Sequence, residues 1–195
     1  MLRHASRETN AYAGVPGTDR LFASGHPGLS SSAPNPLGLI DSTDGGHIWT
    51  PKSLVGEVDF HALATDGEVL VGFDGTTGLL VSTDAGVTWS PGAPLVAAAL
   101  AVNDDGVWAV TVDGLQHSSD SARTFTAVPD APRLMLLSAA GDGSLWGVDT
   151  EGVAWRSDTG RTCEQKAVVG PVEALLAVDV DTAYAATAQQ LFTLE

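Results

Sequence analysis

The sequence predicts an all-β fold built from five repeated sheets, and three observations support this prediction. Its 195 residues are enough for one domain that buries roughly 70% of its unfolded surface. Hydrophobic residues make up 44% of the chain, which excludes general disorder. Four segments repeat at regular intervals, and within each repeat short apolar runs alternate with turn residues.

The repeated segments align without gaps. They begin at Gly38, Gly78, Gly114 and Gly152, so their starts lie 40, 36 and 38 residues apart. They read GLIDSTDGGHIW, GLLVSTDAGVTW, GLQHSSDSARTF and GVAWRSDTGRTC, and QLFTLE from Gln190 repeats the opening once more. Five repeats therefore fill the chain as a single domain over residues 1–195. Their approximate bounds are 8–54, 55–92, 93–130, 131–169 and 170–195, the last completed by an N-terminal strand.

Each repeat predicts four short strands. In the second repeat, the runs FHALA, VLVGF, GLLVS and VTWS are separated by turn residues. A four-stranded sheet cannot bury both faces alone, so successive sheets must stack, and radial stacking gives a β-propeller of about five four-stranded blades. The Ala-rich run from Val96 to Ala101 is interpreted as the inner strand of the third repeat, because turn residues bound it on both sides.

The fifth repeat supplies only three strands, from about Val172 to Glu195. We expect the N-terminal stretch Met1–Asn10 to complete the last blade beside Leu191–Leu194, because an open strand edge invites aggregation. The alternative is an incomplete six-bladed ring.

The repeated segments match the Asp-box, or BNR, motif Ser-x-Asp-x-Gly-x-x-Trp. The two full matches are Ser42, Asp44, Gly46 and Trp49, and Ser82, Asp84, Gly86 and Trp89. On these residues, and on the run SGHPG…PNPLGLIDSTDGG…GEVDFHAL, the chain resembles sialidase-type Asp-box propellers and a bacterial group labelled glycosyl hydrolase. The resemblance covers essentially everything after Thr18, and it implies the propeller fold and an extracytoplasmic location.

Two later repeats depart from the motif. The third keeps Asp120 but has Ala122 for glycine and Phe125 for tryptophan. The fourth keeps Asp158 and Gly160 but has Arg156 for serine and Cys163 for tryptophan. We expect these two turns to be less rigid, and Cys163 to fill the place of a tryptophan with much less apolar area.

The Asp-box is interpreted as a structural turn between the third and fourth strands. Its aspartate accepts backbone N–H groups, its glycine supplies a positive φ, and its tryptophan packs between neighbouring sheets. A repeated carboxylate site for calcium or sugar is the alternative. It is disfavoured because a turn lock is needed once in each blade, whereas a catalytic site is needed only once.

The candidate binding residues lie in the loops of the opposite face. In a four-stranded meander, the 2→3 loops and the 4→1 links share the face away from the Asp-box turns. His26 stands in an inserted loop spanning Ser24–Leu37, Asp74 in the next 2→3 loop, and Asp59 in the 4→1 link that leads to His61. We expect these four residues to converge, because loops on a rigid scaffold commonly carry binding.

Two interpretations of this cluster stand. The residues are either solvated loop polars, with His61 capping the channel, or a ligand or metal site. His26 and His61 with one carboxylate suit zinc or iron, and no other cofactor is expected. A shared metal requires imidazoles a few ångströms apart, and its binding should weaken as pH falls through about 6, because only the neutral ring binds metal.

Further polar residues are expected around the propeller axis. The starts of the inner strands are assigned to Asn10, His61, Ala98, Arg133 and Glu173. This mixed polar rim suits a small polar ligand, so Arg133 and Glu173 join the candidate ligand-binding residues.

The family's sialidase chemistry is not matched residue by residue. Sialidases hold the substrate carboxylate with three arginines and use a Tyr–Glu pair and an acid/base aspartate, but the usual Phe/Tyr-Arg-Ile-Pro sequence is absent here. Arg123 and Arg161 fall in Asp-box turns, and Tyr12 and Tyr184 have no glutamate neighbour. A two-carboxylate glycosidase without the arginine triad remains open.

Charge and composition exclude other classes. With 24 acidic and 9 basic residues, the net charge is −15, which argues against nucleic-acid binding. No stretch approaches the ~18 apolar residues of a membrane span. A lone Cys163 cannot form an internal disulfide, and the start of the chain lacks the apolar core of a secretory signal.

Two function classes follow. The first is a non-catalytic ligand-binding, protein-binding or assembly propeller, as the resemblance to Asp-box proteins that assemble photosystem II or act as sorting receptors implies. The alternative is an exo-acting glycoside hydrolase of the sialidase superfamily. The expected partner is a small polar ligand, a glycan or a protein.

Overall fold

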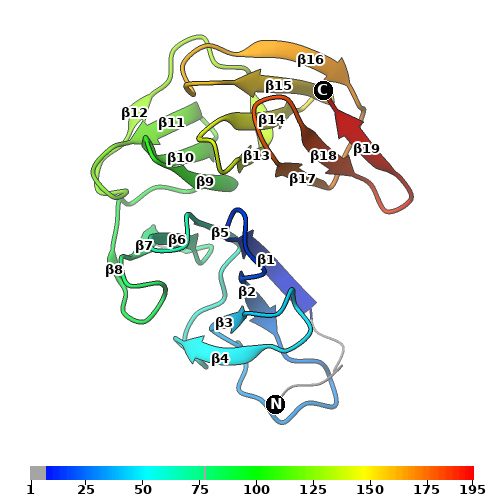
Figure 1. Ribbon diagram of the computed structural model, residues 1–195. Helices are drawn as coiled ribbons and strands as arrows, with labels where there is room; N and C mark the ends of the chain where they lie inside the picture. The colour runs from blue at the N-terminus through cyan, green and yellow to red at the C-terminus, as the bar shows by residue number, and fades with distance from the viewer. Residues whose placement is uncertain (1–7, 77) are drawn as a thin grey trace. The chain divides into compact units, whose positions relative to one another are not determined.

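The computed structural model describes residues 8–76 and 78–195 (Figure 1). The described residues form strands and turns without a helix, so none of them belongs to a helix able to cross a membrane. Five antiparallel sheets follow one another along the chain. The predicted fold class, an all-β propeller of five blades, is confirmed.

Each sheet is one blade, and its strands pair in chain order. Blade 1 contains β1 (Glu8–Gly14), β2 (Leu21–His26), β3 (Leu39–Ser42) and β4 (Thr50–Ser53). Blade 2 contains β5 (Ala62–Thr65), β6 (Leu70–Phe73), β7 (Leu79–Ser82) and β8 (Ser90–Pro91). Blade 3 contains β9 (Ala99–Asn103), β10 (Gly106–Thr111), β11 (Gly114–Ser118) and β12 (Thr126–Ala127).

The last two blades differ in strand number. Blade 4 contains β13 (Leu134–Ala139), β14 (Leu145–Asp149), β15 (Val153–Ser157) and β16 (Glu164–Val168). Blade 5 is a three-stranded sheet of β17 (Ala174–Ala177), β18 (Ala183–Ala186) and β19 (Leu191–Leu194). The chain divides into two compact units at Val96/Ala97, so blades 1 and 2 form one unit and blades 3 to 5 the other. The single-domain assignment of residues 1–195 stays a prediction.

Two boundary predictions need correction. Glu8 to Asn10 are not a strand of the last blade's sheet, because they belong to β1, where Glu8 is paired with His26 of β2. Residues 1–7 lie outside the described residues, so ring closure and the six-bladed alternative stay predictions. The inner strand of blade 3 begins at Ala99 rather than Val96.

The core of each unit lies between its blades. Between blades 1 and 2, Phe22 and Leu39 pack against Phe60 and Leu70, all fully buried. Between blades 3 and 4 the cluster centres on Trp108 and Leu145, and between blades 4 and 5 on Trp146 and Leu194. Alternate strand residues supply these side chains, which is the pattern of sheets covered on both faces.

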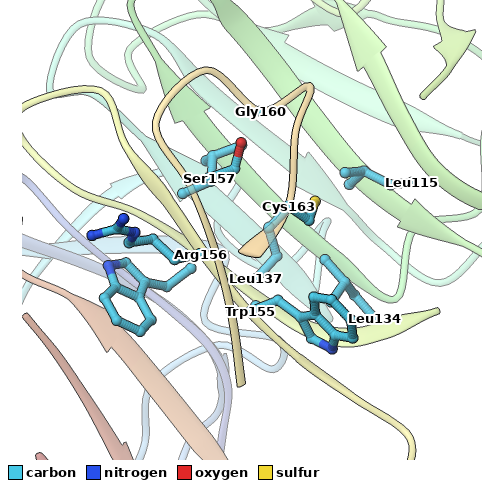
Figure 2. A pocket seen from close by; sticks show the side chains of 11 residues that line it. Leu115, Leu134, Leu137, Trp155, Arg156, Ser157, Gly160 and Cys163 are labelled. Carbon is cyan, nitrogen blue, oxygen red and sulfur yellow. The ribbon is translucent and has the colours of Figure 1, made fainter. Parts of the chain in front are cut away.

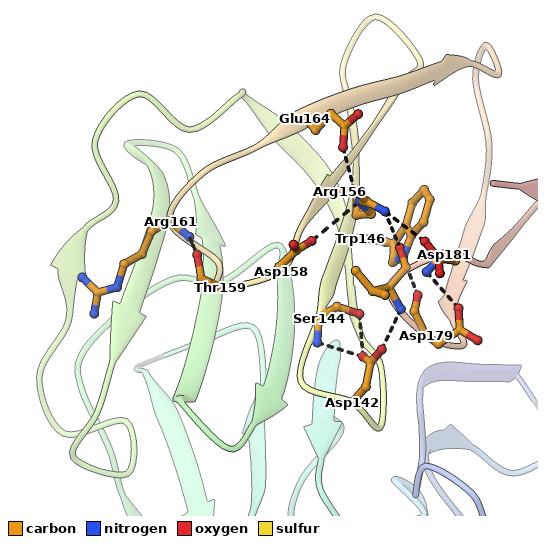
Figure 3. Close-up of polar contacts among 11 residues, drawn as sticks. Asp142, Ser144, Trp146, Arg156, Asp158, Thr159, Arg161, Glu164, Asp179 and Asp181 are labelled. Carbon is orange, nitrogen blue, oxygen red and sulfur yellow. Dashed lines mark hydrogen bonds and ion pairs between the residues drawn. The ribbon is translucent and has the colours of Figure 1, made fainter.

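Blade 4 also holds blade 5 through polar contacts (Figure 3). The indole Nε1 of Trp146 donates to the carbonyl of Asp179 at 2.9 Å, and the N–H of Val180 donates to Asp142 Oδ2 at 2.7 Å. Arg156 Nη1 donates to the Val180 carbonyl at 3.0 Å. The turn between β17 and β18 is therefore tied to the preceding blade.

Candidate functional site

Three of the repeated turns share one hydrogen-bond pattern, and we call them the Ser-x-Asp turns: 42–48, 82–88 and 118–124. In the second, Ser82 Oγ donates to Asp84 Oδ1 at 2.7 Å and accepts the N–H of Gly86 at 2.9 Å. Asp84 Oδ1 also accepts the N–H of Thr88 at 2.9 Å. The equivalent bonds join Ser42, Asp44, Gly46 and Ile48, and Ser118, Asp120, Ala122 and Thr124.

These bonds stabilise the charged carboxylates. Hydrogen bonds from the hydroxyl and N–H of Thr88, and then from Ser82, lower the pKa of Asp84 to about 2. The same pattern, led by the Thr124 hydroxyl, lowers the pKa of Asp120. The N–H of Ile48 is the main cause of the lowered pKa of Asp44. These carboxylates accept hydrogen bonds within their own turns and therefore stabilise the turn conformation.

The third turn keeps this pattern without glycine. Ala122 is fully buried and adopts a φ of 59°, beside Ser121 with the same positive φ. Its N–H still reaches Ser118 Oγ at 3.0 Å. The substitution therefore places a non-glycine residue at a strained positive φ while the turn keeps its hydrogen bonds. The expected loss of rigidity stays a prediction.

The fourth turn departs from the gap-free alignment by one residue. Leu145 is paired with Ser157, as Leu70 is paired with Ser82, so Ser157 rather than Arg156 occupies the place of the buried serine. The turn is one residue shorter as a result. Ser157 Oγ is buried without a hydrogen-bond partner among the described residues. The Asp158 side chain is 69% exposed and faces Arg156 Nε at 3.7 Å.

The aromatic residues after these turns pack differently from blade to blade. Trp89 is partly buried between blades 1 and 2, where its ring lies 5.0 Å from Phe60. Trp49 is 9% exposed and packs on Ile40 of its own blade. Phe125 and Cys163 are partly buried at the equivalent places.

On the opposite face, three of the predicted site residues meet around one oxygen atom. Asp59 Oδ2 lies 3.1 Å from His26 Nε2 and 3.5 Å from His61 Nε2. It also accepts a hydrogen bond of 2.6 Å from Asn10 Nδ2. We call these four residues the Asp59 cluster.

Local backbone bonds explain this convergence. Asp59 lies on the link from β4 to β5, and the next residue, Phe60, donates its N–H to the buried Ser24 Oγ at 2.9 Å. The N–H of His61 donates to the carbonyl of Phe73 at 2.7 Å. The link is thus bonded to β2 on one side and β6 on the other, which directs Asp59 toward both blades.

The inserted loop, which runs from Pro27 to Gly38 after β2, contacts the cluster through Asn35. Asn35 Oδ1 lies 2.6 Å from His26 Nδ1. The side chains of His26 and His61 are 41% and 57% exposed, whereas Asp59 is only 15% exposed. Asp59 Oδ1 is buried and has no hydrogen-bond partner among the described residues. A shielded carboxylate therefore orients two accessible imidazoles.

Asp74 lies in the neighbouring loop. Its Oδ1 accepts the N–H and the hydroxyl of Thr76 at 2.9 and 2.7 Å. The next residue, Gly75, lies against the His61 ring, because a Cβ built on it would stand 3.4 Å from His61 Cδ2. The loop of Asp74 thus borders the Asp59 cluster.

The remaining two candidate ligand-binding residues, Arg133 and Glu173, are not brought into contact with the Asp59 cluster by any ion pair of the described residues. Arg133 and Glu173 are exposed and take part in no ion pair within the described part of the chain. Within residues 8–76 and 78–195, no group of three or more histidine, cysteine, aspartate or glutamate side chains has an arrangement that would hold a metal ion. Metal binding by His26 and His61 stays a prediction.

No protein family and no curated protein matches the chain. Among solved structures it is similar to "YCF48 bound to D1 peptide", with a TM-score of 0.58 and 14% identity over 100% of this chain and 71% of that one. For a chain of the nidogen/laminin complex the TM-score is 0.71, with 10% identity over 96% and 75%.

A Niastella koreensis GH74 enzyme is also similar, with a TM-score of 0.64 and 17% identity. The match covers 91% of this chain and 33% of the enzyme, so the chain spans about a third of it. These neighbours are β-propellers, and at such identities the likeness shows the fold alone.

Proposed function

We propose that this chain is a non-catalytic binding propeller of the sialidase-like Asp-box type, with a peptide or protein partner that docks on the Asp59 cluster. The convergence of Asn10, His26 and His61 on one oxygen of Asp59 carries this proposal. Both imidazoles are accessible, and their orientation is set by a shielded carboxylate. Preorganised polar groups of this kind bind with little ordering cost.

The charges of the site favour a ligand that donates hydrogen bonds. Asp59 favours the tautomer of His61 that carries its proton on Nε2, which leaves Nδ1 as an acceptor. The chain's net charge of −15 attracts cationic groups and repels anionic sugars. A lysine or arginine side chain of the partner fits these requirements.

Two structural neighbours support a protein partner. Their names record YCF48 bound to a D1 peptide and a nidogen/laminin complex. The hydrolase alternative needs an acid and a second carboxylate. Two other well-shielded carboxylates are engaged elsewhere: Asp41 pairs with Arg20 and Lys52, and Asp149 accepts the indole N–H of Trp155. Asp41 and Asp149 therefore do not favour the hydrolase alternative.

The test uses a phage-displayed random peptide library. Selected peptides should be rich in lysine or arginine, and His61→Gln and Asp59→Asn should each weaken their binding about 10-fold. His47→Gln is the matched control, because it makes the same substitution at an exposed histidine of the first Ser-x-Asp turn, and it should leave binding unchanged. Equal affinity for the wild type and His61→Gln would contradict the proposal.

Two further measurements separate the alternatives. Fluorogenic glycosides test the hydrolase, and turnover that disappears in Asp59→Asn would replace the binding proposal with a catalytic one. Metal analysis of the purified protein tests the zinc expectation, and zinc that is lost in His26→Gln would assign a metal site to the cluster.

A further inference from the structure

The described residues of blade 5 lack the fourth strand that each of the other four blades has. In blade 4, the turn from Ser157 through Gly160 to Cys163 (Figure 2) returns the chain along β15 as β16. The strand β19 is likewise the third strand of its blade, but it pairs only with β18 among the described residues. The side of β19 that faces away from β18 is therefore open, and we call it the β19 edge.

The hairpin of β18 and β19 determines which backbone groups point to this edge. Its turn closes with a hydrogen bond of 2.9 Å from the N–H of Thr187 to the carbonyl of Gln190. The two strands pair in an antiparallel ladder without a bulge, and in such a ladder every second residue bonds to the neighbouring strand. Counted from Gln190, the residues of β19 that bond to β18 are Phe192 and Leu194.

Leu191 and Thr193 therefore direct their N–H and C=O groups to the β19 edge. Both side chains are exposed, that of Leu191 at 71%. Edge strands in natural proteins are commonly protected against pairing by a charged side chain, a proline or a bulge. The strand Leu191–Leu194 contains none of these. The β19 edge is thus open to pairing with a further strand.

The charge around blade 5 favours a cationic partner. Residues 167–195 contain no lysine, arginine or histidine and four acidic residues, Glu173, Asp179, Asp181 and Glu195. Of these four, Asp181 alone pairs with a cation among the described residues, at 3.3 Å from Arg156. A second copy of the chain would bring the same acidic residues to the edge, so charge repulsion disfavours pairing between two β19 strands.

We propose that the β19 edge binds an extended segment of a partner protein that carries lysine or arginine and adds to blade 5 as its antiparallel fourth strand. Backbone hydrogen bonds to Leu191 and Thr193 supply affinity, as in other complexes formed by strand addition. A β-branched residue of the segment pairs with the Leu191 side chain. The segment is short, because the fourth strands β8 and β12 contain only two residues each.

The probe is a short capped peptide in which threonine and valine alternate between two terminal lysines. In the free chain, the amides of Leu191 and Thr193 should exchange with solvent rapidly, and those of Phe192 and Leu194 slowly. Saturating peptide should slow exchange at Leu191 and Thr193 by at least about 10-fold, with a Kd of about 0.1–1 mM. The same peptide with terminal glutamates should bind at least about 10-fold more weakly.

Thr193→Pro tests the backbone contact. It removes one N–H from the β19 edge and none that bonds to β18, so the chain should fold and bind the lysine peptide at least about 10-fold more weakly. Thr193→Val is the matched control, because it keeps the N–H and should bind within about 2-fold of the wild type. Should Thr193→Pro fail to fold, Leu191→Lys places a like charge beside the peptide and should weaken binding at least about 3-fold.

Three results would overturn the proposal. Slow exchange at Leu191 and Thr193 in the free chain would show that the edge is already covered. Equal peptide affinity for Thr193→Pro and the wild type would exclude pairing at this edge. A dimer of the wild type that Thr193→Pro dissociates would assign the edge to a second copy. The surface does not involve the Asp59 cluster, so Asp59→Asn should bind the lysine peptide like the wild type.

Discussion

The indole Nε1 of Trp89 donates a hydrogen bond to Ser53 Oγ at 3.0 Å, across the boundary between blades 1 and 2. The same hydroxyl donates to the carbonyl of Gly86 at 2.6 Å. Ser53 therefore joins the last strand of one blade to the Ser-x-Asp turn of the next. The ring of Trp89 adds apolar contact with Phe60 at this boundary.

Removal of the Trp89 side chain should destabilise the first unit strongly. Trp89→Ala should cost about 3–5 kcal/mol, because it leaves a cavity beside Phe60. Trp89→Phe keeps a ring but leaves Ser53 Oγ without its donor, so it should cost about 1 kcal/mol. Urea unfolding measures both. A cost below about 1 kcal/mol for Trp89→Ala would disprove the packing role.

Acid should weaken the Ser-x-Asp turns in a defined pH range. The pKa of Asp84 is lowered to about 2, from an ordinary value of 3.8. A carboxyl group with a lower pKa in the folded state stabilises the fold above its unfolded pKa, and this contribution disappears as pH falls from about 4 to about 2. The melting temperature of the wild type should fall steeply in this range.

Asp84→Asn should make that pH dependence shallower, because it removes one titrating group. Asp104→Asn is the control, since Asp104 is exposed and its carboxylate accepts no hydrogen bond from the described residues. Identical slopes for the two variants between about pH 4 and 2 would show that Asp84 is not a source of acid sensitivity.

The fourth turn should be intolerant of a methyl group. Gly160 has a φ of 69°, and a Cβ there would collide with the indole of Trp108. Gly170 has a similar φ of 72° but open space around it. Gly170→Ala should therefore cost about 1 kcal/mol from backbone strain alone. Gly160→Ala should cost a further ~1–3 kcal/mol from overpacking. Equal melting temperatures for Gly160→Ala and Gly170→Ala would contradict this prediction.

Arg156 should protect the last blade from opening. Its guanidinium contacts the Val180 carbonyl, Asp181 and Glu164. Hydrogen exchange at the amides of β17–β19 should be faster in Arg156→Ala than in Arg161→Ala, because the Arg161 guanidinium makes no hydrogen bond or ion pair with the described residues. The effect should be modest, about 1 kcal/mol, because Glu164 and Asp181 are largely exposed. Equal exchange rates at these amides in both variants would show that Arg156 does not protect the last blade.

The repeat predicts the five blades well because each blade needs the same alternation and the same turn chemistry. It fails by one residue in blade 4, where β15 continues to Ser157. A shift of one residue exchanges the inward and outward side chains, and the turn that follows is one residue shorter, so the alignment shows no gap.

Strand connectivity places His26, Asp59 and His61 on one face, and the structure brings them together as expected. Asn10 was expected at the rim, but its bond to Asp59 depends on the register of β1. The contact of Asn35 with His26 depends on the path of the inserted loop. Neither contact has a local signal in the sequence, because strands β2 to β4 separate Asn10 from Asp59, and the loop between His26 and Asn35 has no regular structure.

The distribution of tryptophan among the blade boundaries has a spectroscopic consequence. Trp89 lies between blades 1 and 2, Trp108 between blades 3 and 4, and Trp146 between blades 4 and 5. Each boundary within a unit therefore contains its own intrinsic fluorophore. In variants that retain one tryptophan each, a red shift of emission would report the wetting of a single boundary, so the order in which the blades separate becomes directly observable.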